Sequence, residues 1–328
     1  MTGLREVIII GGGLAALSAA LYLGRSRRDT LLIHSGRSMA KWEVQVQSYL
    51  GFLDGIAGAD LLERGMKQAV RFEVKIVEDE VQSMMTNDKT FNIQGRQGSY
   101  DAKRVLIATG LTHLPPDLPG VKECLGKSLF FCKDCDAYRL QGQRVGIIGR
   151  NNEAVDYALG MLLFTPSVAL VTNGREAQWD NDHAEWLEEY QIPVRQDVIH
   201  ALEHEKGLLR TLTFARGEPV KMDAIFTTRG DVPHSALATA IGALVDAEGQ
   251  IIMDERLSTN VPGLYAAGCV TPANCQMIIA AGQGAIAAQA INRDLFEDSL
   301  RRHTLPRFGG QTYESKKCEQ DYVETQSS

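Results

Sequence analysis

The stretch EVIIIGGGLAALSAALYLG, residues 6–24, decides the fold of this 328-residue chain. An apolar strand runs into a glycine turn, and a helix rich in alanine and leucine follows it. Gly11, Gly13 and Ala16 match the G-x-G-x-x-G/A pattern of a dinucleotide-binding turn. The first glycine makes the turn, the second lets the backbone approach a pyrophosphate, and the small third residue lets helix and strand pack closely.

Composition restricts the class of protein. A length of 328 residues, 44% of them hydrophobic, supports two globular domains. The net charge is -7 and no long basic run occurs, so we expect no nucleic-acid partner and no membrane partner. No apolar run approaches the roughly 20 residues of a membrane helix. The N-terminus lacks the layout of a signal peptide, so we expect a cytoplasmic protein.

Three separated segments predict an interrupted nucleotide-binding domain. The strand DTLLIHSG ends near His34, a position where an Asp or Glu usually binds ribose hydroxyls. Residues 6–24 are the first of the three segments. The second is the strand YDAKRVLIATG at residues 100–110, and the third is a strand near residue 264, after LSTNVPG. The third strand leads into a helix rich in small residues. Segments so far apart predict a flavin-binding domain with an insertion.

The whole pattern resembles the low-molecular-weight thioredoxin reductases over residues 5–295. The most specific shared motif is Cys132-Lys-Asp-Cys135-Asp136, which lies shortly before a second glycine turn. The resemblance implies an α/β fold of two Rossmann-like, three-layer dinucleotide-binding domains, the second inserted in the first. The expected bounds are 1–116 and 246–296 for the FAD-binding domain, 117–245 for the redox-disulfide domain with a degenerate NAD(P)H-type site, and 297–328 for the C-terminal tail.

The resemblance also implies FAD in the first domain, with contacts carried over by position. The expected contact residues are Gly11, Gly13, Leu14, Ala15, Ala16, His34, Val81, Thr109, Gly110, Gly268, Cys269, Gln276 and Met277. Some of them depart from the family pattern. His34 replaces a glutamate, RSMAKW at residues 37–42 replaces a Gly-Gly-Gln-Leu loop, and Gly268-Cys269 replaces Gly-Asp. We therefore expect some polar contacts to the flavin to differ from those of the family.

The cysteine pair indicates thiol chemistry. A Cys-x-x-Cys pair on a turn that leads into a helix can close a small disulfide, and the helix dipole lowers the thiol pKa. Zinc would need further Cys or His ligands at metal spacing, and none follows, so we expect no metal. The resemblance implies that Cys135 receives electrons from the flavin, that Cys132 attacks the partner's disulfide, and that Asp136 protonates the departing thiolate. Cys124 is interpreted as a buried thiol.

The second glycine turn, around RVGIIGRNNEAV, departs from the sequence pattern of a dinucleotide-binding turn. Its expected second-site residues are Gly149, Arg150, Asn151, Asn152, Glu153 and Asn173. Asn151 stands where the family has a glycine; Asn tolerates a left-handed backbone, but its side chain obstructs a pyrophosphate. Thr172-Asn173-Gly174 stands where the family has a His-Arg-Arg cluster for the 2′-phosphate of NADPH. Both losses argue against NADPH as the donor.

With these departures the chain resembles the pyridine-nucleotide-independent branch of the family. Within that branch, the departures in the loop and in the tail favour the diflavin-linked disulfide oxidoreductases. We therefore expect a flavin-dependent disulfide oxidoreductase that passes electrons through FAD and Cys132–Cys135 to a thioredoxin-like disulfide protein. A second FAD is expected in the vacated site, and a ferredoxin-type donor and a homodimer are further expectations. Three alternatives stay open: an NADPH-thioredoxin reductase, a dithiol oxidase that uses oxygen, and a flavin-bound redox sensor, against which the intact cysteine motif argues.

Overall fold

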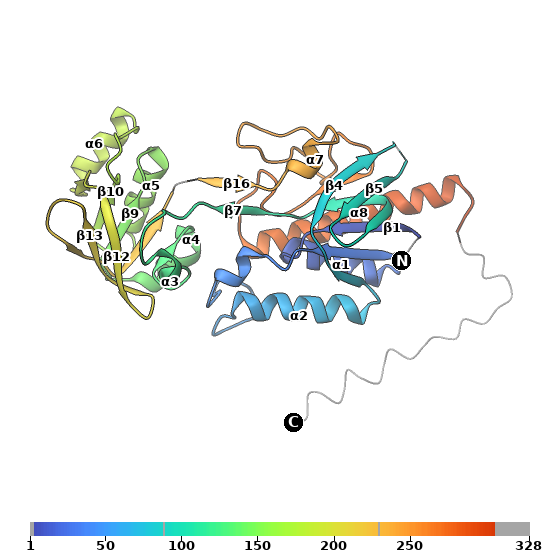
Figure 1. The fold of residues 1–328 in the computed structure, drawn as a ribbon, viewed down its shortest axis with the longest axis horizontal. Coiled ribbons are helices and arrows are strands. Elements are labelled where there is room, and N and C mark those ends of the chain that lie inside the picture. The colour runs from blue at the N-terminus through green and yellow to red at the C-terminus, as the bar shows by residue number, and fades with distance from the viewer. Residues whose placement is uncertain (1–2, 88, 229, 306–328) are drawn as a thin grey trace, which may run out of the picture. The chain divides into compact units, whose positions relative to one another are not determined.

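The computed structural model describes residues 3–87, 89–228 and 230–305. Its elements group into two larger sheets, each with helices packed on it, and two small sheets (Figure 1). The mixed α/β fold with two Rossmann-like sheets confirms the predicted fold class.

The first sheet has seven strands in the order β3-β2-β1-β6-β5-β4, with β17 also paired to β6. Their bounds are β1 Leu4–Ile10, β2 Thr30–His34, β3 Lys75–Glu78, β4 Val81–Thr86, β5 Phe91–Gly95, β6 Ser99–Ile107 and β17 Leu264–Ala266. Strand β6 is long enough to pair with β5 through its first half and with β17 through its second half. Strands β3, β2, β1, β6 and β17 are parallel, so their carboxyl ends share one edge.

Helices cover this sheet. Their packing accounts for the continuous apolar residues of its strands. The helices are α1 Leu14–Arg25, α2 Gly58–Arg71, α7 Ala236–Thr239 and α8 Met277–Arg301, with the 3-10 turn η1 at Met39–Trp42. The last four residues of β1 are at most 4% exposed, as expected for a parallel strand covered on both faces. Gly284 of α8 lies against the Ala15 carbonyl of α1, where a Cβ would be 2.1 Å from the oxygen. This glycine allows α1 and α8 to pack closely.

The second sheet repeats the same plan with five parallel strands in the order β11-β10-β9-β15-β8. Its elements are β8 Leu129–Phe130, β9 Val145–Ile148, β10 Val168–Val171, β11 Val194–Arg195, β15 Ala224–Thr227, α3 Val121–Cys124, α4 Lys133–Asp136, η2 Ala137–Leu140, α5 Asn152–Met161 and α6 Asn181–Glu189. Beside it stands an antiparallel sheet of β12 Ile199–Glu205, β13 Leu208–Phe214 and β14 Val220–Lys221. Both larger sheets therefore place a glycine turn after their central strand, β1 or β9.

Two chain crossings join the two sheets. Strands β7 (Leu111–His113) and β16 (Asp231–Pro233) pair antiparallel, so the chain leaves and returns side by side. Ala238 and Ala243 pack in the core of the first sheet, although the sequence placed them in the inserted domain. We therefore propose that the insertion ends at β16 and not at residue 245, while its start near residue 117 is kept.

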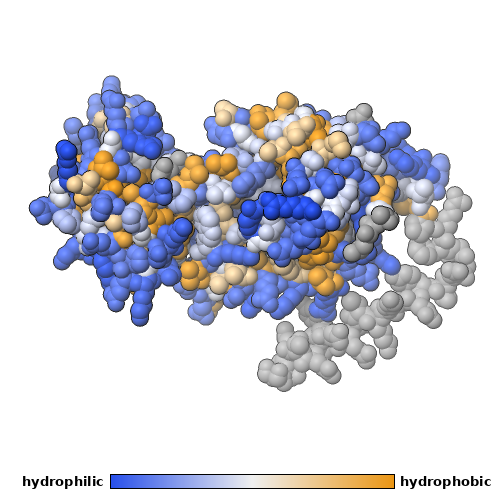
Figure 2. Space-filling view, viewed as in Figure 1, coloured by the Kyte–Doolittle hydropathy of each residue, from blue (hydrophilic) through white to orange (hydrophobic). Residues whose placement is uncertain are grey.

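The chain divides into two units, residues 1–292 and 293–328, and of the second unit residues 293–305 are described. Helix α8 continues into the second unit as far as Arg301, and we therefore propose that the tail begins after this residue and not at residue 297. The tail residues from 306 onward, Cys318 among them, lie outside the described residues. Among the helices of the described residues, none has the length and apolar character needed to cross a membrane. The face in Figure 2 is mainly hydrophilic, with separate apolar patches.

Candidate active site

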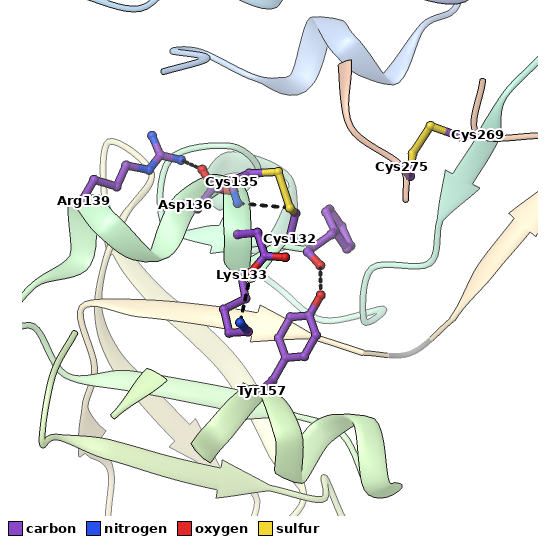
Figure 3. Close-up of a disulfide and its surroundings, with 10 residues drawn as sticks. Cys132, Lys133, Cys135, Asp136, Arg139, Tyr157, Cys269 and Cys275 are labelled. Carbon is purple, nitrogen blue, oxygen red and sulfur yellow. Dashed lines mark hydrogen bonds and ion pairs between the residues drawn. A yellow bond between two sulfur atoms is a disulfide. The ribbon is translucent and has the colours of Figure 1, made fainter. Parts of the chain in front are cut away.

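Cys132 and Cys135 form a disulfide at the start of α4, as the motif predicted. Cys132 is the N-terminal cap of this short helix, and the backbone N–H of Cys135 donates to its Sγ at 3.1 Å (Figure 3). The short helix begins directly after Cys132, and its first turn brings Cys135 close enough for the two sulfur atoms to bond. The N–H directed at Sγ also stabilises negative charge on Cys132 when the disulfide opens.

Asp136 is the titratable group next to this disulfide, and it is 4% exposed. Burial, with the negative charge of Glu43 as a second cause, raises the pKa of Asp136 to about 7. Arg139 opposes the shift, because its Nη2 donates to Asp136 Oδ1 at 2.6 Å. The guanidinium of Arg139 in turn lies over the Phe130 ring, 4.3 Å from its centroid. Asp136 can therefore hold or release a proton near neutral pH, as a general acid must.

Aromatic side chains that the sequence analysis missed fix the segment before the disulfide. The hydroxyl of Tyr157 donates to the Phe131 carbonyl at 3.0 Å (Figure 3), and burial raises the pKa of Tyr157 to about 12. The ring of His113, at the first chain crossing, stacks on Phe131 with centroids 4.6 Å apart. Sequence offered one signal for this packing, the pair of phenylalanines directly before Cys132.

The first glycine turn has the geometry of a phosphate site. Gly11 has φ +135°, and a Cβ there would lie 2.0 Å from the Ala108 carbonyl oxygen. Gly13 is the N-cap of α1 without a side-chain cap, and a Cβ added to it would meet nothing within 4 Å. The N-terminal N–H groups of α1 therefore face open space, as pyrophosphate binding requires. Leu14, Ala15 and Ala16 form the buried first turn of this helix.

His34 ends β2 at the edge where ribose binds in such domains. Its Nδ1 accepts a hydrogen bond from the N–H of Gly36 at 3.0 Å, and burial lowers the pKa of His34, which favours the neutral ring. Glu78 ends the adjacent strand β3, in register with His34, and its Oε1 would lie 2.9 Å from a Cβ on Gly36. Sequence analysis missed Glu78, which brings a carboxylate to the same edge from a neighbouring strand.

The other expected FAD residues lie at different places along the first sheet. Thr109 donates to the His234 carbonyl at 2.7 Å, so its hydroxyl ties the two chain crossings together, and Gly110 follows with φ +67°. Val81 begins β4 and packs against the core. Gln276 and Met277 stand at the start of α8.

Gly268 and Cys269 follow β17 at the carboxyl edge of the first sheet. The N–H of Gly268 donates to Gln283 Oε1 at 2.7 Å, and Gln283 lies in α8, about two turns beyond the expected Gln276. Cys269 is bonded to Cys275 in a second disulfide. Sequence analysis named Cys269 only as a flavin contact and did not pair it. Cys124, in contrast, is a free and fully buried thiol, as predicted.

The second glycine turn differs from what we expected. Asn151 has φ -112° and is not left-handed; its side chain accepts a hydrogen bond from the Ala154 N–H and caps α5. The amide of Asn152 donates to Asp180 at 2.7 Å. Asn173 has φ +52°, and its Oδ1 accepts from the Ile199 N–H at 2.8 Å. Three residues that we expected at a second nucleotide site are thus engaged within the protein.

The rest of that turn is shaped by packing and by acidic groups. A Cβ on Gly149 would lie 2.3 Å from Thr228 Oγ1 and 2.5 Å from the Ala154 Cβ, so glycine is needed there for close packing. Arg150 follows it, and its carbonyl accepts from the Gln178 N–H. Burial and the charge of Asp231 raise the pKa of Glu153. Within the described residues no group of three or more His, Cys, Asp or Glu side chains could hold a metal ion.

Comparison with known proteins identifies the family. Residues 5–288 match the family described as pyridine nucleotide-disulphide oxidoreductase. The chain belongs to this family. It is 32% identical to a thioredoxin reductase of Treponema pallidum, over 87% of this chain and 95% of the relative. It is 27% identical to a thioredoxin reductase of Bacillus subtilis, over 87% of this chain and 93% of the relative.

Solved structures support the same assignment. The crystal structure of HlmI superposes with a TM-score of 0.86 at 31% identity and covers 92% of this chain and 96% of that chain. A putative thioredoxin reductase of Bacillus anthracis gives a TM-score of 0.82 at 28% identity, with 90% and 99% covered. The protein is an FAD-dependent disulfide oxidoreductase of the thioredoxin reductase type, with Cys132–Cys135 as a redox disulfide.

The first glycine turn fits the FAD of this family. The strained glycine at position 11 and the uncapped start of α1 leave room and donors for a pyrophosphate. When bound, FAD supplies two-electron transfer to a disulfide. The chain's own residues hold the cofactor and manage the protons of the thiols.

Proposed function

We propose that the protein passes electrons through FAD to Cys132–Cys135 and from there to a thioredoxin-like disulfide protein, without NADPH as the donor. The observation that carries the first half is the disulfide at α4 with a buried carboxyl group of pKa about 7 beside it. The relatives named thioredoxin reductases support the choice of partner.

The exchange with the partner needs only Cys132, Cys135 and Asp136 of this chain. The thiolate of Cys132 attacks one sulfur of the partner's disulfide and forms a mixed disulfide, while the other partner sulfur leaves as a thiolate. Asp136 gives its proton to a departing thiolate. Cys135 then attacks Cys132, restores their disulfide and releases the reduced partner. One dithiol is oxidised and one disulfide is reduced.

Variants of the cysteine pair test this part. Cys135→Ser is expected to keep FAD bound but to abolish disulfide reduction, because no thiol remains to resolve the mixed disulfide. Cys132→Ser is expected to leave a thiolate at Cys135 beside the flavin, seen as a long-wavelength charge-transfer band. Cys124→Ser is the matched control, since this thiol is buried and unpaired. Full activity in either pair variant would remove the central claim.

The proposal against NADPH is supported by the second glycine turn. Asn151 places its side-chain amide at the N-terminus of α5, 3.3 Å from the Ala154 nitrogen, where a phosphate would bind. Thr172, Asn173 and Gly174 provide no cation for a 2′-phosphate, and the acidic Glu153 stands at the start of α5. Anaerobic NADPH at millimolar concentration is expected to bleach the flavin slowly or not at all. A fast stoichiometric bleach would restore the ordinary NADPH-dependent reductase.

A second candidate role for this turn is to hold another FAD, as in the diflavin-linked oxidoreductases. The side-chain oxygens of Thr172, Thr227 and Thr228, at the carboxyl ends of β10 and β15, are buried and have no hydrogen-bond partner among the described residues. Unpaired buried hydroxyls at this edge favour a polar ligand, since each such group costs stability. A flavin dinucleotide has no 2′-phosphate and needs no arginine cluster.

The FAD content of the pure protein tests the second candidate. Denaturation releases non-covalent flavin, and a ratio near two per chain is expected. A ratio that stays near one after reconstitution with excess FAD would overturn it.

We further propose a homodimer, for which the molar mass in solution is the test. Two other electron donors can be tested by the flavin absorbance. One measurement adds reduced ferredoxin to the protein, and the other adds a small dithiol with oxygen.

A further inference from the structure

The electron path proposed above does not use the disulfide Cys269–Cys275. Its two cysteines are six residues apart and close the loop between β17 and α8. Cys269 directly follows Gly268, and Cys275 lies two residues before the first residue of α8. Figure 3 labels this disulfide as well as Cys132–Cys135.

The loop lies at the carboxyl edge of the first sheet, beside the first glycine turn. A Cβ on Gly268 would lie 3.0 Å from the Ala15 Cβ, in the first turn of α1. Strand β17 pairs in parallel with β6, whose other neighbour is β1. Ligands of such sheets bind outside the carboxyl ends of the strands. The disulfide therefore belongs to the wall of the FAD site and not to a remote surface.

The loop does not depend on the disulfide for its conformation. Gly268 donates to Gln283 Oε1 at 2.7 Å, and the hydroxyl of Thr271 donates to the Gly268 carbonyl at 2.8 Å. The N–H of Ile251 donates to the Val270 carbonyl at 2.8 Å. Stabilisation by a disulfide grows with the length of the loop that it closes, and this loop is short. A purely structural role is therefore a weak explanation.

Exposure and charge favour thiol chemistry at this place. Cys269 and Cys275 are both partly exposed, whereas the free thiol of Cys124 is fully buried. The first turn of α8, a helix of 25 residues, contains no acidic residue. A thiolate formed at Cys275 would lie next to the positive end of that helix, which lowers a thiol pKa.

We propose that Cys269–Cys275 is a second redox-active disulfide, which exchanges an electron pair with the flavin of the first site. The inference rests on the proposed function in that FAD occupies that site. In the forward step the S–S bond breaks, two electrons and one proton pass from the reduced flavin FADH⁻ to the pair, and the flavin returns to FAD. The products are one thiolate and one thiol. The pair thus stores one electron pair beside the flavin.

The test is an anaerobic titration of the FAD-loaded protein with dithionite, followed by alkylation of thiols and peptide mass analysis. Trypsin releases Cys269 and Cys275 on one peptide, residues 257–293, separate from the peptides of Cys132 and Cys135. Two labels are expected on peptide 257–293 after the flavin is bleached. Complete bleaching of the double variant Cys269→Ala/Cys275→Ala is expected to need one two-electron equivalent less than the wild-type protein. Cys124→Ser, the matched control, is expected to need as many as wild type.

The outcomes separate this inference from the proposed function. Labels on Cys132 and Cys135 with none on peptide 257–293 would overturn the second disulfide and leave the proposed function intact. Labels on peptide 257–293 alone would support the second disulfide and overturn the proposed function. Equal labelling in protein without FAD would show direct reduction and overturn the exchange with flavin. If the double variant fails to hold FAD, the labelling of peptide 257–293 in the wild-type protein still tests the inference.

Discussion

The N-cap residues that end the two glycine turns have similar backbone conformations and opposite chemistry. Gly13, the N-cap of α1, has φ -87° and ψ -175°, while Asn151, the N-cap of α5, has φ -112° and ψ 177°. The first cap has no side chain and leaves the N–H groups of its helix uncapped. The second uses its own amide oxygen to accept from the Ala154 N–H. At the cap position, one side chain on a similar backbone separates an open helix N-terminus from one that is capped by its own residue.

This difference teaches that a Rossmann turn can lose ligand affinity without losing its fold. The cap stabilises α5, since Asn is among the preferred N-cap residues. The same side chain occupies the space in front of the helix N-terminus where a pyrophosphate would bind. The domain with the altered turn nevertheless keeps the disulfide and its acid, so the two properties of the domain are separable. Four predictions test this comparison and the group that the altered domain keeps, from the largest expected effect to the smallest.

Gly11→Ala is expected to have the largest effect, with loss of nearly all bound FAD. Its φ of +135° is costly for a residue with a Cβ, about 1–3 kcal/mol, before the contact with the Ala108 carbonyl is counted. Released flavin per chain and thermal unfolding measure the effect. Gly149→Ala in the second turn is the matched variant, expected to destabilise its own domain but to keep the first flavin. Equal flavin loss in both variants would contradict the distinction.

The second prediction concerns Asp136, which the domain of the altered turn retains. Disulfide reduction is expected to fall as pH rises through about 7, where the pKa of Asp136 lies, because the proton donor is lost. Asp136→Asn is expected to lower the rate by roughly 100-fold and to flatten this profile. Steady-state rates with a protein disulfide across pH measure both.

The same group makes a prediction for stability. The pKa of Asp136 is raised in the folded protein, from 3.8 to about 7, so the folded state binds the extra proton between these values. Its contribution to stability is therefore fully present below pH 3.8 and is lost as pH rises through about 7. Unfolding of Asp136→Asn should lack this component. An unchanged pH dependence in the variant would show that Asp136 titrates elsewhere.

The smallest effect is expected from Asn151→Gly, which imitates the first turn. A glycine cap costs only a few tenths of a kcal/mol relative to Asn but removes the side-chain amide from the N-terminus of α5. The rate of flavin bleaching by NADPH is expected to rise about tenfold, the value of roughly 1.4 kcal/mol of binding. Asn151→Ala, which loses the cap but keeps a Cβ, is the control and should cost about 1 kcal/mol of stability. A glycine variant as inert as the wild type would place the obstacle elsewhere.

Much of the fold and part of the site were predictable from local pattern. The strand–turn–helix of residues 6–24, the second turn near Gly149 and the Cys132–Cys135 pair all lie within short segments whose spacing specifies their geometry. The residues that tune the site were not predictable. Glu43, for example, is far from Asp136 in the chain and contributes to its raised pKa only because folding brings its charge near.

Sequence by itself determined the two Rossmann-like sheets, the redox pair and the changed composition of the second turn, because each depends on neighbours along the chain. Tertiary structure decided what those residues do. Asn151 turned from an expected left-handed residue into a helix cap, and Cys269 turned from a flavin contact into half of a disulfide. The physical reason is that hydrogen-bond partners, burial and sulfur pairing are set by distances in space, which spacing along the chain does not specify.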